Sequence, residues 1–221
     1  MSRRILTGIT TTGIPHIGNY FGAIKPALQL SCEKNVSSYF FLADLHAIIK
    51  QTNPNEIKVS VNEVALAWLS SGLDPEESFF YRQSNIPEIT ELAWILSCVT
   101  AKGLINRSHA YKAAVQLNHD HTKDEDKGIS MGLFSYPVLM AADILMFNSS
   151  HVPVGNDQLQ HLEITRDIAE KFNHQYGNTF VIPEAIINKD GKLLVGHDGR
   201  KMSKSYNLSL IHISEPTRPN C

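Results

Sequence analysis

Short apolar segments with the composition of buried strands alternate with helix-length segments along most of this 221-residue chain. Strands separated by helices of this length are typical of a parallel sheet with helices on both faces. The sequence therefore predicts an α/β fold with a doubly wound parallel sheet. The strand-like segments are residues 5–6, 38–42, 78–81, 152–154 and 179–182, and helical spacing follows His16, Pro54 and Asp157.

Residues 87–142 interrupt this alternation. No strand-like run follows the amphipathic helix predicted there, whose apolar side chains are Leu92, Ile95, Leu96 and Val99. We therefore predict a helical insertion between the two halves of the sheet. The polar run 118–127 within it carries His119 and His121, which is compatible with a metal site, but we favour a solvent-exposed loop.

Composition narrows the class of protein. Hydrophobic residues make up 43% and charged residues 19%, which is ordinary for a globular chain long enough to bury a core. No apolar run approaches the ~18 residues that span a bilayer, and residues 1–10 lack the apolar core of a signal peptide. The net charge of −2 means that any RNA partner must be met by local basic patches. We expect a cytoplasmic protein without a metal site, because the cysteines match neither a disulfide framework nor zinc-ligand spacing: Cys32, Cys98 and Cys221.

Residues 6–20 contain the first candidate site. An apolar run leads into a small-residue turn that contains Gly8, Gly13 and three consecutive threonines, and helical spacing begins after His16. A strand, a small-residue loop and a helix together aim backbone N–H groups at an anion. The imidazole of His16, the amide of Asn19 and the hydroxyls add side chains that can bind phosphate. An ordinary βα turn is the alternative.

Asp143 is the second candidate, because it is a carboxylate within a strongly apolar segment. On a helix it shares one face with Tyr136 and Met140. Pro137 either starts this helix or kinks it. Burial of an unpaired carboxylate costs several kcal/mol, so Asp143 either bonds backbone donors in the core or accepts a proton from a ligand.

Two later segments carry further polar groups. Residues 152–158 repeat the order of strand, turn and helix, and Asp157 can cap that helix or, with Gln158, bind a sugar hydroxyl or an ammonium group. Lys201 and Lys204 form a compact basic segment after two glycines. A solvated loop is the alternative, but a triphosphate held by the first loop needs such counter-charge at its far end.

Together these segments resemble the class I aminoacyl-tRNA synthetases, and within them the bacterial tryptophanyl-tRNA synthetases. The resemblance covers about residues 3–207 and implies a Rossmann-like catalytic domain over residues 1–207, which includes the helical insertion. Many family members have Gln-Pro-Ser where this chain has three threonines, so any contact of that Gln is not carried over. The matching motifs, in order, are residues 16–19, 44–47, 136–145, 152–158 and 201–205.

The resemblance also implies roles for individual residues. Those implied to act in catalysis are His16, Asn19, Lys201 and Lys204. Those implied to bind ATP are Thr10, Thr11, Thr12, His16, Gly18, Asn19, Gly155, Asn156, Asp157, Lys201, Met202, Ser203, Lys204 and Ser205. Those implied to form the tryptophan pocket, with Asp143 accepting the indole N–H, are Asp143, Tyr136, Met140, His46, Val152, Val154 and Gln158.

The implied reaction activates L-tryptophan with ATP and Mg²⁺ to tryptophanyl-adenylate and transfers it to tRNA(Trp). A homodimer with its surface on residues 87–142 is a further expectation. The alternatives are a tyrosine-specific class I synthetase, another nucleotidyltransferase, and an ATP- or RNA-binding paralogue that charges no tRNA. The resemblance ends near residue 207, and residues 208–221 read as a non-native tail. We therefore expect the anticodon-binding helical domain to be absent from this chain and its tRNA charging to be defective.

Overall fold

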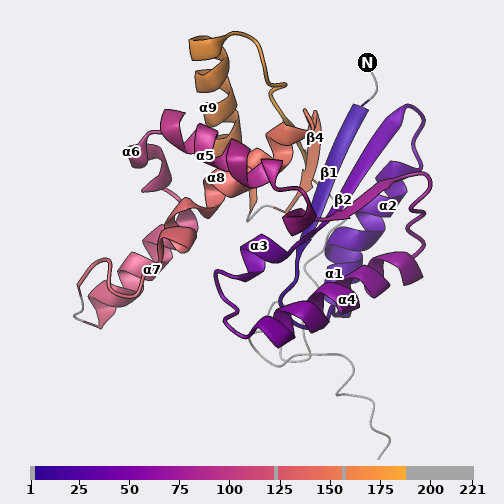
Figure 1. The fold of residues 1–221 in the computed structure, drawn as a ribbon, viewed down its shortest axis with the longest axis horizontal. Helices are drawn as coiled ribbons and strands as arrows, with labels where there is room; N and C mark the ends of the chain where they lie inside the picture. The colour runs from indigo at the N-terminus through magenta and orange to yellow at the C-terminus, as the bar shows by residue number, and fades with distance from the viewer. Residues whose placement is uncertain (1–2, 122–123, 156–157, 188–221) are drawn as a thin grey trace, which may run out of the picture.

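The computed structural model describes residues 3–121, 124–155 and 158–187. Within them, five parallel strands form one sheet in the order β3-β2-β1-β4-β5 (Figure 1). This order confirms the predicted doubly wound parallel sheet, because helices follow the strands and cover both faces. The strands are β1 (Arg3–Thr10), β2 (Val36–Ala43), β3 (Phe79–Arg82), β4 (His151–Val154) and β5 (Glu184–Ile187).

One face of the sheet packs against α2 (Lys25–Ser31) and α4 (Pro54–Ser70). The α4 helix begins where predicted, because Asn53 caps it by accepting a hydrogen bond from the N–H of Asn55 at 3.0 Å. Trp68 of this helix is fully buried against Phe40 of β2, with ring centroids 4.9 Å apart. These apolar contacts hold the first half of the sheet.

The helical segment predicted after His16 is confirmed, but it contains a wider turn. It comprises α1 (Ile17–Asn19), the π-helical turn η1 (Tyr20–Ile24) and α2. The N–H of Lys25 bonds the carbonyl of Tyr20, five residues back. Pro26 lacks an N–H and its ring crowds the carbonyl four residues earlier, so we attribute the wider turn to this proline.

The opposite face packs against α8 (Met131–Met146) and α9 (Leu159–Tyr176). Pro137 lies inside α8 rather than at its start. Between β3 and β4 the described chain also contains η2 (Gln83–Asn85), α5 (Glu88–Val99), α6 (Lys102–Ile105) and α7 (His109–Asp120). Figure 1 shows α7 and the first part of α8 extending away from the sheet. No helix of the described residues is long and apolar enough to cross a bilayer.

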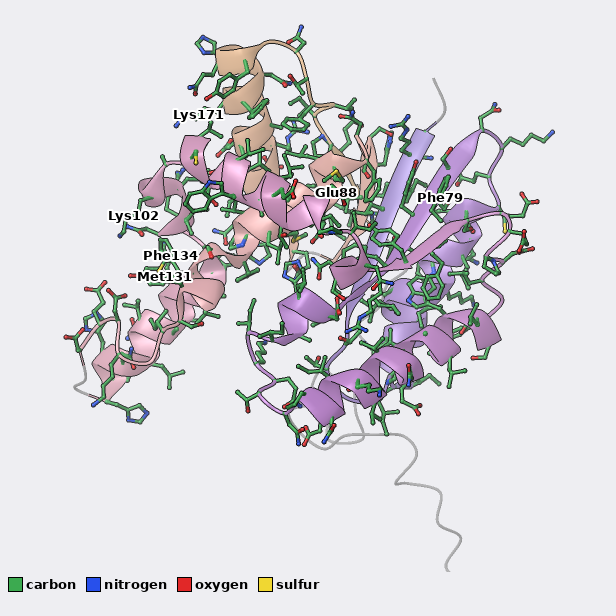
Figure 2. All side chains as sticks on the ribbon, viewed as in Figure 1. Phe79, Glu88, Lys102, Met131, Phe134 and Lys171 are labelled. Carbon is green, nitrogen blue, oxygen red and sulfur yellow. The ribbon has the colours of Figure 1, made fainter. Side chains whose placement is uncertain are left out.

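Side-chain contacts also hold this helical region together. Figure 2 labels Lys102 of α6 close to Phe134 of α8, and the Lys102 ammonium lies 5.5 Å from the Phe134 ring centroid. Such a contact is a cation–π interaction. At the outer edge of the sheet, the labelled Phe79 of β3 stacks on Tyr39 with ring centroids 4.7 Å apart.

Several sequence predictions of local structure are wrong. Gly8 lies within β1 and not in the turn, because β1 continues to Thr10. Residues 179–182 form no strand, since Phe180 packs on Phe172 of α9 at 4.8 Å and β5 begins only after Pro183. The polar run 118–127 is helical up to Asp120, where α7 ends.

The chain order reverses between β1 and β4. Eight residue pairs join β1 to β2, whereas β1 and β4 are paired at Ile5 and His151. In open parallel sheets, ligands bind at the carboxyl ends of the strands beside such a reversal. This places the candidate site near Thr10 and Val154, where β1 and β4 end.

Candidate active site

The loop after β1 contains the first predicted site residues. The N–H of Thr12 bonds the carbonyl of Thr10 at 2.9 Å, which turns the chain at the strand end. His16 is the N-cap of α1, and its backbone N–H donates to Asn19 Oδ1 at 3.0 Å. The Asn19 side chain therefore has a structural task, because it fixes the start of the helix.

The side chains of this loop differ in exposure. Thr10 is exposed and Thr12 is half-buried, whereas Thr11 is fully buried and its hydroxyl has no partner among the described residues. The structure thus buries the Thr11 side chain, whereas its neighbour Thr10 stays exposed. Gly18 leaves room for His16, since a Cβ at position 18 would lie 2.8 Å from the imidazole Cε1.

Asp143 is at the centre of a buried hydrogen-bond network. Its side chain comes from α8 and is fully buried. Oδ2 lies 2.8 Å from Nε2 of His46, which belongs to α3 (Asp44–Ala47). Oδ1 accepts a hydrogen bond from Nε2 of Gln83 at 2.8 Å. The sequence left open whether backbone or ligand donors satisfy this carboxylate, and the structure shows two side-chain donors.

Gln83 is a site residue that the sequence analysis missed. It is fully buried, and its Oε1 accepts a hydrogen bond from the N–H of Leu45 at 3.1 Å. Gln83 thus joins the ends of β2 and β3 to α8. The sequence contained a signal for this residue. Gln83 directly follows a strand, as do the polar residues after β2, and ligand sites lie at the carboxyl ends of parallel strands.

Burial sets the electrostatics of this network. Desolvation raises the pKa of Asp143 above its ordinary value, although hydrogen bonds from His46 and Gln83 act in the opposite direction. Burial and the nearby charge of Asp143 also raise the pKa of Tyr81. The Tyr81 hydroxyl has no hydrogen-bond partner among the described residues.

A second buried carboxylate holds the adjacent strand ends together. Asp44 accepts hydrogen bonds from Nε of Arg82 at 2.5 Å and from the N–H of Ser84 at 3.0 Å. Burial by itself would raise the pKa of Asp44, but these bonds to Ser84 and Arg82 keep it below its ordinary value. Asp44 is therefore a structural anchor for the segment that carries His46.

Tyr136 of α8 contacts two histidines. Its hydroxyl lies 2.7 Å from Nε2 of His161 on α9, and its ring meets His46 edge-to-face with centroids 6.4 Å apart. Met140 and Val154 pack against the apolar cluster between the sheet and α8, to which Val152 belongs. The structure thus brings together most of the residues predicted for the tryptophan pocket.

Part of the predicted ATP site can be located. Gly155 is exposed directly after β4, and its carbonyl accepts from the N–H of Gln158 at 2.9 Å. Asn156 and Asp157 lie outside the described residues. The same holds for the basic segment with its neighbours, namely Lys201, Met202, Ser203, Lys204 and Ser205, and for the tail 208–221.

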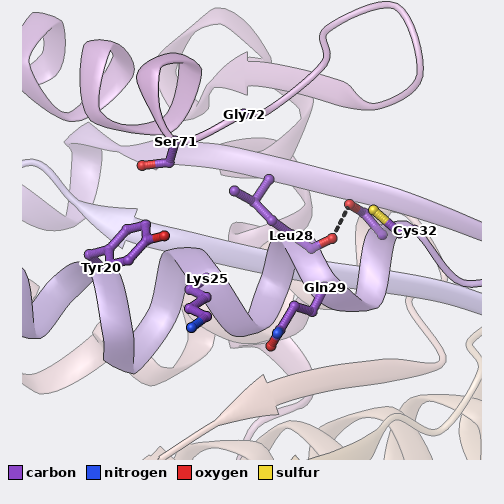
Figure 3. Close-up of a pocket in the computed structure, with 8 residues that line it drawn as sticks. Tyr20, Lys25, Leu28, Gln29, Cys32, Ser71 and Gly72 are labelled. Carbon is purple, nitrogen blue, oxygen red and sulfur yellow. Dashed lines mark hydrogen bonds between the residues drawn. The ribbon is translucent and has the colours of Figure 1, made fainter.

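Two hollows accompany these elements. One, of about 460 Å³, is lined by Tyr136 and Leu139 of α8, by Leu45 of α3 and by Ile48 and Ile49 directly after α3. The other, of about 310 Å³, lies between α2 and the end of α4 and contains Lys25 and Cys32 (Figure 3). It contains none of the predicted site residues. No group of three metal-binding side chains occurs among the described residues.

Curated proteins with high sequence identity are named tryptophan–tRNA ligases. The protein from Bordetella pertussis is 61% identical over 208 residues, which cover 94% of this chain and 46% of that protein. The protein from Pseudomonas aeruginosa is 58% identical over 221 residues, covering 99% of this chain and 49% of its own length. The chain thus spans about half the length of these relatives.

Solved structures agree with the sequence relatives. The tryptophanyl-tRNA synthetase of Campylobacter jejuni, solved in complex with ADP and tryptophan, superposes with a TM-score of 0.83 at 46% identity, covering 93% of this chain and 61% of that chain. The tyrosyl-tRNA synthetase of Archaeoglobus fulgidus shares the fold, with a TM-score of 0.71 at 20% identity and coverage of 94% and 60%. The family model of the class I tRNA synthetases (W and Y) matches residues 2–219, and the chain therefore belongs to this family.

Proposed function

We propose that this chain contains the amino-acid activation site of a tryptophan–tRNA ligase. The observation that carries the proposal is the buried Asp143 with donors on both oxygens, which come from residues that follow β2 and β3 of a sheet related to synthetase sheets. The tryptophan carboxylate attacks the α-phosphorus of ATP, which enters as its magnesium complex. The bond to the β-phosphate breaks, tryptophanyl-adenylate forms and pyrophosphate leaves.

Catalysis in this proposal consists of positioning and charge stabilisation. His16 ends the loop after β1 and Asn19 lies in the helix α1 that follows it, where they would bind the phosphates. Negative charge grows on pyrophosphate as the bond breaks. Lys201 and Lys204 would stabilise this charge, as the resemblance implies. The adenylate would then transfer its tryptophanyl group to tRNA(Trp).

Asp143 would select tryptophan by accepting the indole N–H. A site that hydrogen-bonds a ligand N–H rejects an analogue that lacks the donor by up to about 10⁴-fold, which disfavours phenylalanine. Tyrosine remains the second candidate, because its hydroxyl also donates. The names of the relatives near 60% identity, and the tryptophan in the complex from Campylobacter jejuni, favour tryptophan.

A homodimer completes the proposal. Four large apolar side chains in the described part of residues 87–142 are exposed, and the two most exposed are Trp94 of α5 at 72% and Met131 of α8 at 74%. Apolar exposure of this kind marks association surfaces when it is contiguous. The expected dimer is measured by analytical ultracentrifugation, with Trp94→Ser shifting the population toward monomer.

The function is tested by ATP–pyrophosphate exchange with each of the amino acids in turn. We expect exchange with tryptophan at a rate at least about 10²-fold above that with phenylalanine, which lacks a donor for Asp143, and also above that with tyrosine. Exchange dependent on tyrosine instead would establish the second candidate. ATP binding without exchange for any amino acid would favour the paralogue that charges no tRNA.

A further inference from the structure

Ser60 connects the loop after β1 to a helix far away in the sequence. Its Oγ accepts a hydrogen bond from the backbone N–H of Gly13 at 2.9 Å, although 47 residues separate the two. Ser60 is only 4% exposed and lies on the buried face of α4 beside Val61 and Val64. The serine is therefore a hydroxyl on an otherwise apolar face, directed at the loop.

The bond holds the middle of the loop. One end of the loop is fixed at Thr10, where β1 ends, and the other at His16, the N-cap of α1. Gly13 lies between them at φ +70°, a left-handed backbone conformation that L side chains rarely adopt. The Gly13 N–H faces a buried helix rather than solvent, so a backbone donor that a phosphate loop would offer to a ligand is already in use.

We propose that Ser60 is a positioning residue for the nucleotide, acting through the loop that carries His16. The inference rests on the proposed function, since it concerns the ATP site. Ser60 holds Gly13 against α4 and so sets where the His16 imidazole stands relative to the end of β1. The phosphates then receive their contacts from the His16–Asn19 side of the loop, and the Gly13 amide stays bonded to Ser60 when ATP is bound.

Loss of the Ser60 hydroxyl should weaken ATP binding selectively, which a purely packing role of Ser60 would not predict. A hydrogen bond of this type contributes about 0.7–1.4 kcal/mol when expressed as a three- to tenfold change in a dissociation constant. If the bond orders the nucleotide loop, its loss weakens ATP binding about three- to tenfold. Binding of the amino acid changes by less than about twofold, because the residues around Asp143 lie on other elements.

The test compares three variants of the full chain. Ser60→Ala removes the acceptor, and Ser60→Thr retains it. Ser38→Ala is the matched control, because Ser38 is 3% exposed on β2 and its hydroxyl has no partner among the described residues. Isothermal titration calorimetry gives the Kd for magnesium-ATP and for tryptophan. Hydrogen exchange followed by NMR gives the protection of the Gly13 amide with and without ATP.

We expect Ser60→Ala to raise the Kd for ATP three- to tenfold and to lose Gly13 protection, with tryptophan affinity unchanged. Ser60→Thr and Ser38→Ala should remain within about twofold of wild type. An unchanged ATP affinity in a folded Ser60→Ala, or equal weakening for ATP and tryptophan, would overturn the inference. If Ser60→Ala fails to fold, loss of Gly13 protection on adding ATP to the wild type overturns it instead. A wild-type chain that binds no ATP refutes the proposed function itself.

Discussion

Nε2 of His46 lies 2.8 Å from Oδ2 of Asp143, although 97 residues separate the two along the chain. Gln83 bonds the other oxygen of the same carboxylate. A carboxylate offers about four lone-pair positions, so one further donor, such as an indole N–H, can be accepted without displacing either partner. Because Asp143 is fully buried, water competes little for that position.

Replacement of Asp143 by asparagine tests this acceptor. The amide keeps the shape but offers one oxygen only, so we expect tryptophan affinity to fall at least about 10²-fold. ATP affinity should change less than about twofold, which calorimetry can measure. The matched control is Asp167→Asn on the exposed side of α9. Retained tryptophan affinity in Asp143→Asn would place the indole elsewhere.

Loss of Gln83 should mainly affect stability. Gln83→Leu leaves Oδ1 of Asp143 and the N–H of Leu45 without partners, and an unsatisfied buried polar group costs about 1–3 kcal/mol. Urea unfolding measures the change. Gln29→Leu, at an exposed position on α2, should shift the free energy of unfolding by less than about 0.5 kcal/mol. Equal effects of the two variants would contradict the network.

Gly8 is expected to tolerate no side chain. A Cβ at Gly8 would lie 2.3 Å from Cζ of Phe41, whose ring is buried and stacked on Tyr81. Overpacking of this kind costs about 1–3 kcal/mol. Thermal unfolding of Gly8→Ala should show that loss, and the additional change Phe41→Leu should recover part of it. Additive losses in this double-mutant cycle would argue against the predicted clash.

The proposed role of Asp143 predicts that tryptophan binding depends on pH. Because burial raises its pKa, the folded protein binds the proton more readily than the unfolded chain, so this group's contribution to stability falls as pH rises from 3.8 through the raised value. Protonation occupies a lone pair of the acceptor. We therefore expect tryptophan affinity to weaken as pH falls through the raised pKa. Equilibrium dialysis over a pH series that starts at the ordinary value of 3.8 measures this, and Asp143→Asn should remove the dependence.

Lys204 is predicted to act on the reaction rate. Loss of one preorganised donor to the developing pyrophosphate charge costs on the order of 10²–10³ in rate. Lys204→Ala should show this loss in single-turnover adenylate formation, while tryptophan affinity stays within about twofold. Lys171→Ala, an exposed lysine on α9 labelled in Figure 2, is the control. Equal losses of rate and tryptophan affinity would refute this assignment.

The local pattern of apolar residues predicted the secondary structure correctly where burial alone decides it. The apolar residues 38–42 must be covered on both faces, and they lie in the central part of the sheet. The same reasoning failed for residues 179–182. Their strand-like composition is satisfied by packing of Phe180 and Ile182 on a helical cluster, not by strand pairing. Composition indicates that these residues must be buried, but it does not indicate which surface of the protein buries them.

The sequence by itself determined the alternation of strands and helices, the polar residues at the strand ends and the need to satisfy a carboxylate at Asp143. Only the tertiary structure decided which groups satisfy it and that Ser60 holds Gly13. The physical reason is the separation along the chain between the residues that interact. Periodicity reports which face of an element is buried, because this depends on neighbouring residues. Hydrogen bonds between segments 47 to 97 residues apart depend on how complete elements pack.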